Sequence, residues 1–229
     1  MTTKKLENLV AIVTGSGGGL GAECARVLAS HGAKLVVVDI NGDAAKSVVA
    51  ELESAGHEAI AVQTDVSSET DVKAMIEKTE AHFGRIDILH NNVGISVEGG
   101  DAPLEDVSID AFERIFDVNL LGTMLACKHV LPIMREQKSG AIVNISSASA
   151  YWTGHPTVLY PASKMAMVSF TRQIAIQNAD VGVRANTILP GLMNTPMAVY
   201  RRVEATGRTR DDIAVRAAVL VGVPFPRAA

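Results

Sequence analysis

Short runs of apolar and β-branched residues recur along the chain, separated by longer segments of mixed character. The runs are residues 9–13, 34–38, 59–63, 86–90, 141–145 and 185–189. None of them shows the strict alternation of apolar and polar positions that is typical of a half-exposed strand. Continuous apolar runs of this length are typical of strands that are buried on both faces of a parallel sheet.

The segments between these runs have a helical period, with apolar residues recurring every three or four positions. Residues 42–55 are followed by Gly56, and residues 68–83 are followed by Gly84. Glycine readily adopts the left-handed conformation that ends many helices, so both glycines mark helix ends. Because strands and helices alternate, the sequence predicts a doubly wound, three-layer α/β sheet with right-handed crossovers.

Finer features of the helices follow from the same pattern. Ser68 and Asp71 resemble a capping box at the start of a helix, with Asp in place of Glu. A longer helical segment covers residues 108–138, and Pro132 indicates a break or kink near its end. No internal repeat or linker divides the sequence, so we expect a single domain over residues 1–229.

The composition is that of a globular protein with a weakly acidic surface. Of the 229 residues, 48% are hydrophobic and 20% are charged, and the net charge is −4. A negative balance disfavours nucleic acid and anionic membranes as partners, because both bind basic surfaces. Apolar stretches such as residues 35–38 and 217–223 are shorter than the roughly 18–20 residues of a membrane span. We therefore expect neither a nucleic-acid partner nor a membrane partner.

Cysteine and histidine usage indicates a cytoplasmic protein without a metal site. The chain has two cysteines, Cys24 and Cys127, without C-x-x-C spacing, and we interpret them as reduced packing residues. The N-terminus carries two lysines but no apolar segment behind them, so we expect no signal peptide. The six histidines are scattered without the spacing of paired ligands, so we expect no metal.

A glycine-rich loop follows the first predicted strand. Gly15, Gly19 and Gly21 form the pattern T-G-x-x-x-G-x-G at the junction with the next helix. At such a junction, backbone N–H groups approach a pyrophosphate and the helix N-terminus adds a favourable partial charge. The loop predicts a dinucleotide site, although Gly17 and Gly18 are also compatible with simple flexibility.

The second predicted strand ends at an acidic residue, Asp39, which lies 24 positions after Gly15. A carboxylate there accepts hydrogen bonds from the adenosine ribose hydroxyls and repels the extra phosphate of NADP. Neither Ile40 nor Asn41 supplies a positive charge to counter it. We therefore expect NAD as the cofactor. The alternative is that Asp39 or Asn41 merely caps the next helix.

Several short motifs occur in an order that resembles one enzyme family. They are TGSGGGLG at 14–21, DV at 65–66, NNVG at 91–94, Asn119 in FDVNLLGT, IVNISSASA at 142–150, YPASK at 160–164, and VRANTILPG followed by NTPM. Together they resemble the short-chain dehydrogenase/reductase family over nearly the whole chain. The sequence departs from that family at Val93, where Ala is usual, and at Pro161, where Ser or Ala is common. It also ends at Ala229, before a further strand and helix.

The resemblance implies NAD-dependent oxidation of a secondary alcohol, or reduction of a ketone, by four catalytic residues. These are Asn119, Ser147, Tyr160 and Lys164, and Ser147 is chosen over Ser146 because it lies thirteen positions before the tyrosine. A helix places Tyr160 and Lys164 on one face, which is also compatible with an ordinary helix surface. The lysine and the nicotinamide would favour the phenolate, and Tyr160 would exchange the substrate proton. Ser147 would stabilise the substrate oxygen and Asn119 would position a relay water.

The resemblance also implies the residues that contact NAD. They are Gly15, Gly19, Leu20, Gly21, Asp39, Asp65, Val66, Asn91, Gly94, Tyr160, Lys164, Pro190, Gly191 and Thr195. Pro161 is compatible with this site, because the first N–H groups of a helix have no partner inside the helix.

The substrate pocket should be formed by residues after Ser147, before Tyr160 and within 191–205. These stretches contain Tyr151, Trp152, His155, Val158, Leu192, Met193, Met197 and Tyr200. Their aromatic and apolar character favours an apolar or cyclic secondary alcohol or ketone. Packing of the Trp152 loop against a neighbouring subunit explains the tryptophan equally well.

Two further functions stay open, namely a non-catalytic dinucleotide-binding regulator or scaffold and a related lyase or epimerase. The end of the sequence raises a structural question, because an edge strand at 185–189 and an apolar run at 217–225 need cover. We therefore expect that the 229 residues are part of a longer chain, and that the last strand and helix of that chain are missing from them. We expect the full protein to be a homodimer or homotetramer.

Overall fold

The chain forms two units, residues 1–189 and residues 190–229. The computed structural model describes residues 4–152, 154–191, 193 and 195. The apolar run at 217–225 therefore lies outside the described residues. The single domain expected over residues 1–229 stays a prediction.

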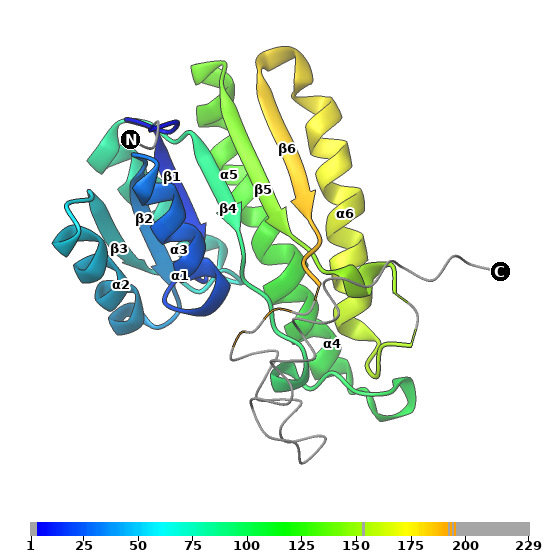
Figure 1. The fold of residues 1–229 in the computed structure, drawn as a ribbon. Coiled ribbons are helices and arrows are strands. Elements are labelled where there is room, and N and C mark those ends of the chain that lie inside the picture. Colours follow the sequence, from blue (N-terminus) through cyan, green and yellow to red (C-terminus); the bar gives the residue numbers. More distant parts are fainter. Residues whose placement is uncertain (1–3, 153, 192, 194, 196–229) are drawn as a thin grey trace. The chain divides into compact units, whose positions relative to one another are not determined.

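Six parallel strands form the sheet of the first unit (Figure 1). They are β1 (Val10–Thr14), β2 (Lys34–Asp39), β3 (Ala59–Gln63), β4 (Ile88–Asn91), β5 (Gly140–Ile145) and β6 (Val183–Ile188). The spatial order is β3-β2-β1-β4-β5-β6, so the sheet grows outward in both directions from β1 and β4. The six predicted strands and the doubly wound fold class are therefore confirmed.

Six α-helices connect the described strands. They are α1 (Gly19–Ser30), α2 (Gly42–Ser54), α3 (Glu69–Phe83), α4 (Ile109–Phe116), α5 (Gly122–Gln137) and α6 (Leu159–Gln177). The shorter helices are η1 (Val97–Gly99), η2 (Leu104–Asp106), the π-helix η3 (Asp117–Leu121), η4 (Ala148–Ala150) and η5 (Ala179–Val181).

Two hydrophobic cores lie on opposite faces of the sheet. In β1, Val10 and Ile12 belong to the core with α3 and α5, whereas Ala11 and Val13 belong to the core with α1 and α2. All four side chains are at most 1% exposed. The strands are continuous apolar runs because both of their faces are buried, and the result is three layers.

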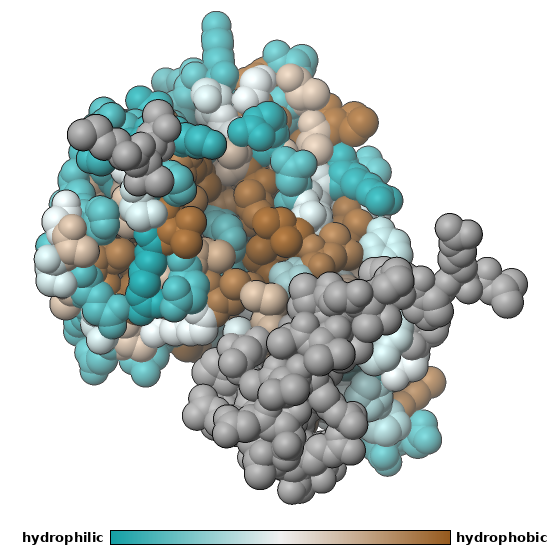
Figure 2. All heavy atoms as spheres, viewed as in Figure 1, coloured by the Kyte–Doolittle hydropathy of each residue, from teal (hydrophilic) through white to brown (hydrophobic). Residues whose placement is uncertain are grey.

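Part of the sheet carries exposed apolar surface on the side of α1 and α2. Figure 2 shows hydrophobic residues gathered in the middle of this face. Ile188, at the end of the edge strand β6, is 50% exposed, and Ala141 and Val143 of β5 are half-buried. The described residues thus leave apolar side chains of β5 and β6 partly uncovered here.

The predicted helix ends agree with the backbone. Gly56 has φ +83° and Gly84 has φ +72°, and both values lie in the left-handed region that glycine tolerates. The capping box is only half formed. Ser68 Oγ accepts from the N–H of Asp71 at 3.3 Å, but the Asp71 carboxylate accepts from the N–H of Asp65 at 3.3 Å rather than from Ser68.

The long segment at 108–138 is interrupted, but not where Pro132 predicted. The helix α5 continues through Pro132 and ends at Gln137, so the predicted break is wrong, whereas the alternative of a kink stays a prediction. Val130 and Met134, on either side of the proline, are fully buried, and this packing holds the helix together despite the missing hydrogen bond. The interruption is the π-helix η3, which contains Asn119.

No helix among the described residues is long and apolar enough to span a bilayer. Within the same residues, no cluster of three or more His, Cys, Asp or Glu side chains is arranged to hold a metal ion. Cys24 and Cys127 are free thiols, and burial raises the pKa of Cys127 to about 12. Cys127 is therefore an unreactive packing residue.

Candidate active site

The residues singled out in the first unit gather at one edge of the sheet, where the parallel strands end. Asp39 and Asn91 are the last residues of β2 and β4, Gly15 follows β1, and Asp65 and Ser147 come shortly after β3 and β5. In an open α/β sheet this edge binds ligands, and a crevice forms where the strand order reverses. That reversal lies here between β1 and β4.

The loop between β1 and α1 requires its glycines. Gly15 and Gly19 have φ values of +63° and +54°, which side chains disfavour. A Cβ atom on Gly21 would clash with the carbonyl oxygen of Gly15, so the loop packs against the start of α1. Above Gly19, a Cβ atom would meet nothing within 4 Å, and Leu20 is half-buried. The loop therefore leaves its backbone accessible to a pyrophosphate at the N-terminus of α1.

Asp39 faces the glycine loop and does not cap a helix. Its Oδ2 accepts from the N–H of Gly17 at 2.9 Å, and its Oδ1 accepts from the N–H of Asn41 at 3.0 Å. Asn41 caps α2, because its side chain accepts from the N–H groups of Asp43 and Ala44 at 3.1 Å. The helix-cap interpretation thus applies to Asn41, and the Asp39 carboxylate contacts the glycine loop instead.

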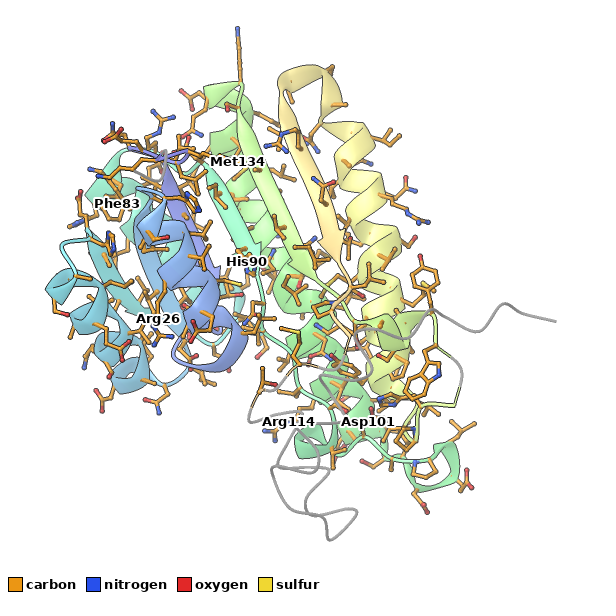
Figure 3. The ribbon with its side chains drawn as sticks, viewed as in Figure 1. Arg26, Phe83, His90, Asp101, Arg114 and Met134 are labelled. Carbon is orange, nitrogen blue, oxygen red and sulfur yellow. The ribbon has the colours of Figure 1, made fainter. Side chains whose placement is uncertain are left out.

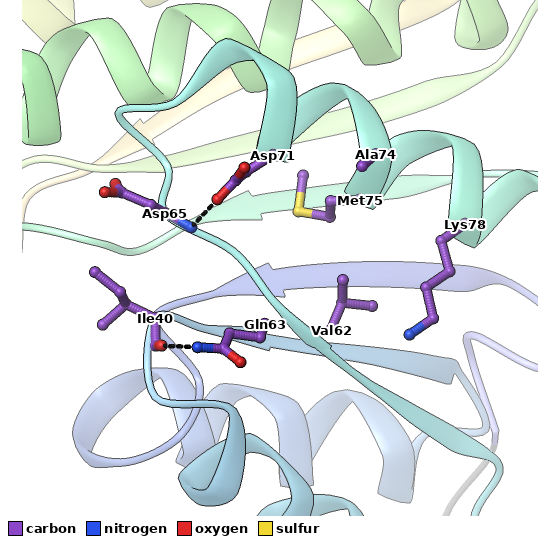
Figure 4. Close-up of a pocket in the computed structure, with 8 residues that line it drawn as sticks. All are labelled: Ile40, Val62, Gln63, Asp65, Asp71, Ala74, Met75 and Lys78. Carbon is purple, nitrogen blue, oxygen red and sulfur yellow. Dashed lines mark hydrogen bonds between the residues drawn. The ribbon is translucent and has the colours of Figure 1, made fainter.

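A cavity of about 590 Å³ lies beside the end of β3 and α3 (Figure 4). It is lined by Ile40, Val62, Gln63, Asp65, Asp71, Ala74, Met75 and Lys78. Asp65 is held in place because its carboxylate accepts from the N–H and the hydroxyl of Ser67, at 2.9 and 2.6 Å. Val66 is buried and would be contacted by a Cβ atom on Gly122 at 2.9 Å. The cavity adjoins the Asp39 side of the edge and contains none of the four predicted catalytic residues.

The side chain of Asn91 is buried and hydrogen-bonded within the interior. Its side chain is 3% exposed and donates to Asn144 Oδ1 at 2.9 Å, and Asn144 in turn donates to Thr171 at 2.8 Å. The neighbouring Asn92, which we did not single out, holds the glycine loop by donating to the Gly15 carbonyl at 3.1 Å. Its only sequence signal was its membership of NNVG.

Gly94 makes room for Lys164 of α6. A Cβ atom at Gly94 would lie 2.9 Å from Lys164 Nζ. Lys164 is 2% exposed, and its ammonium donates to the Ile145 carbonyl at 2.8 Å. Burial lowers the pKa of Lys164 from 10.5 to about 8. The ammonium lies 5.7 Å from the centre of the Tyr160 ring, so the two residues share one face of α6 as predicted.

Tyr160 and Ser147 face each other across this edge. Burial raises the pKa of Tyr160, and a hydrogen bond with Ser147 lowers it by less. The net direction is opposite to the lowering expected from Lys164, because burial of the phenol outweighs the other effects within the chain. Ser146 is not available as the predicted catalytic serine, because its buried hydroxyl donates to the Lys164 carbonyl at 2.7 Å.

Asn119 is buried in η3 and fully engaged with neighbouring groups. Its Oδ1 accepts from the N–H of Ile95 at 2.8 Å, and its Nδ2 donates to the Ile95 carbonyl at 2.9 Å and to Ser163 Oγ at 3.0 Å. Ser163 Oγ donates to the carbonyl of Tyr160 at 2.8 Å. The side chain of Asn119 therefore links two segments of the site, and a water relay at this residue stays a prediction.

The remaining predicted residues are divided between the two units. Tyr151 and Trp152 are each 53% exposed, and His155 stacks on Tyr160 with 6.1 Å between ring centres. Pro190, Gly191, Met193 and Thr195 belong to the second unit, in which the N–H of Thr195 donates to the Met193 carbonyl at 2.9 Å. Leu192, Met197 and Tyr200 lie outside the described residues.

Comparison with known proteins identifies the family. A family model described as short chain dehydrogenase matches residues 9–205. The cis-4-hydroxycyclohexanecarboxylate dehydrogenase of Sinomonas cyclohexanicum is 38% identical over 206 residues, which are 89% of this chain and 82% of the relative. The crystal structure of levodione reductase has a TM-score of 0.84 at 35% identity, and the match covers 92% of this chain and 81% of that chain.

A second solved structure carries the cofactor. It is a 7α-hydroxysteroid dehydrogenase in complex with NADH and 7-oxo glycochenodeoxycholic acid, with a TM-score of 0.80 at 31% identity, and the match covers 95% of this chain and 88% of that chain. The oxidoreductase activity and the NAD(H) cofactor expected from the sequence are thereby confirmed. The chain belongs to the short-chain dehydrogenase/reductase family.

Proposed function

We propose that Tyr160 is the general acid and base in the interconversion of a secondary alcohol and a ketone. The observation that carries this proposal is the grouping of Tyr160, its hydrogen-bond partner Ser147 and the buried Lys164 at the carboxyl edge of the sheet. The bound NAD supplies the hydride acceptor, and NADH the donor. Tyr160 accepts the alcohol proton in oxidation and returns it in reduction.

The other three residues support this proton transfer. Ser147 holds the substrate oxygen next to the phenol and stabilises charge that develops on it. With a pKa of about 8, Lys164 is mainly protonated at pH 7, and its positive charge favours the phenolate. Asn119 fixes the Ile95 backbone and the start of α6 through Ser163, so that the phenol is held in one place.

The cofactor contacts complete the proposed site. The glycine loop of Gly15, Gly19 and Gly21 fits a pyrophosphate, because its backbone is open and the N-terminus of α1 adjoins it. Asp39 binds the ribose hydroxyls and selects NAD over NADP. The other proposed contacts are Leu20, Asp65, Val66, Asn91, Gly94, Pro190, Gly191 and Thr195.

We propose a cyclic or largely apolar secondary alcohol as the substrate. Two relatives support this, because one is named for a hydroxycyclohexane acid and one for a hydroxysteroid. Tyr151 and Trp152 come soon after Ser147, and both are exposed at 53% and therefore available to an apolar molecule. A role of Trp152 in packing against a second subunit is the alternative.

The assembly and the location of the protein are also proposals. A homodimer or homotetramer is supported by apolar side chains on helix surfaces, since Ile109 is 72%, Phe112 44% and Ile176 78% exposed. Light scattering at micromolar concentration tests it, and a monomer would contradict it. A cytoplasmic location is supported by the free thiols Cys24 and Cys127.

One experiment tests the activity. The purified protein is mixed with NAD⁺ and a panel of cyclic and acyclic secondary alcohols, and the absorbance of NADH is followed. Turnover of at least one alcohol supports the proposal. Binding of NADH without turnover of any alcohol or ketone in the panel would instead favour a non-catalytic dinucleotide-binding protein.

A further inference from the structure

The first turn of α6 carries Tyr160 but has no capping group of its own. Val158 stands at the N-cap without a side-chain hydrogen bond, and the turn contains no acidic residue. The N–H groups of Leu159 and Tyr160 instead donate to the carboxylate of Asp101, each at 2.9 Å. Because such N–H groups lack partners inside a helix, Asp101 caps α6 from a different part of the chain.

Asp101 accepts from the unpaired donors of the first two helical residues, Leu159 and Tyr160. Pro161 has no N–H group, and the N–H of Ala162 donates to the Val158 carbonyl at 3.3 Å. Among the helical residues of the first turn, the two donors left by Pro161 and Ala162 are therefore those that Asp101 accepts. A carboxylate suits this position because the N-terminus of a helix favours negative charge.

Asp101 is also built into the interior. It is 4% exposed, and its Oδ2 accepts from Thr157 Oγ1 at 2.6 Å and from Ser96 Oγ at 3.3 Å. Thr157 Oγ1 lies 3.1 Å from Nδ1 of His155, whose ring stacks on Tyr160. A buried carboxylate needs several donors of this kind, and each of these donors belongs to a segment next to Tyr160 or to the Asp101 loop.

The loop that carries Asp101 makes close contacts near both of its ends. At its start, the N–H and carbonyl of Ile95 are both bonded to the Asn119 side chain, at 2.8 and 2.9 Å. Before its end, Gly100 has φ +92°, and a Cβ atom there would lie 2.9 Å from the Cβ of Ala111. Through these hydrogen bonds, the loop links the Asn119 side chain to the backbone of Tyr160. Figure 3 shows Asp101 near the start of α6.

We propose that Asp101 is a positioning residue, whose carboxylate fixes the backbone of Tyr160 so that the phenol meets the substrate. Tyr160 is held on both sides, at its N–H by Asp101 and at its carbonyl by Ser163. This inference rests on the proposed role of Tyr160. A displacement of about 1 Å in a reacting group costs on the order of 100-fold in rate, so loss of the cap lowers kcat.

The main test replaces Asp101 by Asn, which keeps the shape but turns one acceptor into a donor. We expect kcat to fall by at least about tenfold, while the dissociation constant of NADH changes by less than about twofold, because Asp101 touches none of the proposed NAD contacts except Tyr160. Asp87→Asn is the matched control. Asp87 is 5% exposed and accepts from the N–H of Val10 at 2.9 Å at the opposite edge of the sheet. The Asp87→Asn substitution should lower the stability of the protein and leave kcat unchanged.

A second pair of variants keeps the carboxylate intact. Thr157→Val removes the hydroxyl that donates to Asp101, and Thr157→Ser keeps it. We expect a several-fold lower kcat for the valine variant and a rescued kcat for the serine variant. This pair decides the question if Asp101→Asn does not fold.

The outcomes separate the two proposals. A kcat within twofold of the native value for Asp101→Asn, with only a lower melting temperature, would show that the cap is merely structural. Equal kcat values for Thr157→Val and Thr157→Ser would overturn the inference as well. An inactive native protein, or a Tyr160→Phe variant with native kcat, would overturn the proposed function and this inference with it.

Discussion

Replacement of Lys164 by Met should make the protein more stable at pH 7 while it damages catalysis. Lys164 is 2% exposed, and burial lowers its pKa from 10.5 to about 8. At about 1.4 kcal/mol per pKa unit, burial disfavours the charged ammonium by roughly 3 kcal/mol. The methionine leaves the Ile145 carbonyl without its donor, which costs about 1–3 kcal/mol. The expected net gain is therefore between about 0 and 2 kcal/mol.

The pH dependence distinguishes this effect from ordinary repacking. The pKa of Lys164 is lower in the folded protein than in the unfolded chain, so between about 8 and 10.5 the unfolded chain binds more protons. Stability from this group therefore rises with pH across that window. Between pH 7 and pH 10, the free energy of unfolding of the native protein should rise by roughly 2–3 kcal/mol relative to that of Lys164→Met. The reason is that the variant has no titrating group at this position.

Chemical denaturation of both proteins at pH 7 and pH 10 measures the difference directly. Lys46→Met is the control, because the Lys46 side chain is 73% exposed and its replacement should give the same difference at both pH values. If the difference between native protein and Lys164→Met is also the same at both pH values, the buried ammonium carries no such cost. The reasoning about Lys164 would then be refuted.

Three further substitutions test other parts of the site. Tyr160→Phe should lower kcat more than tenfold with NADH binding retained, and a barrier change below about 1.4 kcal/mol would contradict a role as proton carrier. Asp39→Ala, or Asp39→Ser with Ile40→Arg, should raise kcat/KM with NADP relative to NAD; better use of NADP by the native protein would contradict the role of Asp39. Gly94→Ala should displace the Lys164 ammonium and lower kcat with little change in melting temperature, as its Cβ would lie 2.9 Å from Nζ. Unchanged kcat would show that the ammonium position is not critical.

The elements that could be predicted from the sequence are those whose signals are local. A strand buried on both faces needs a continuous apolar run, and a left-handed helix end favours a glycine such as Gly56 or Gly84. The site residues at the strand ends were predictable for a related reason. Asp39 and Asn91 end strands and Gly15 follows one, and parallel strands end on the same side of a sheet. Asn119, Tyr160 and Lys164 follow no strand directly, and only the family resemblance of their motifs pointed to them.

Properties decided by packing were harder to predict. Pro132 removes a hydrogen bond from α5, but the buried neighbours Val130 and Met134 keep the helix intact. The lowering of the Tyr160 pKa expected from Lys164 and a bound nicotinamide stays a prediction, and within the chain alone burial of the ring raises this pKa. Neither the burial of a helix face nor the desolvation of a phenol can be read from residues adjacent in the sequence.

Asp101 shows the same limit in a more specific form. The start of α6 lacks Ser, Thr, Asp or Asn at the N-cap, and Pro161 in its first turn removes only one donor. The sequence thus leaves the other N–H groups of this turn without a local acceptor, but it does not say which residue supplies one. The carboxylate lies 58 positions before Leu159 in the sequence. It reaches the helix because the contacts of Asn119 and Gly100 shape the loop that carries Asp101. A first turn without a cap, next to a proposed catalytic tyrosine, is therefore a reason to look for a buried acidic residue elsewhere in the fold.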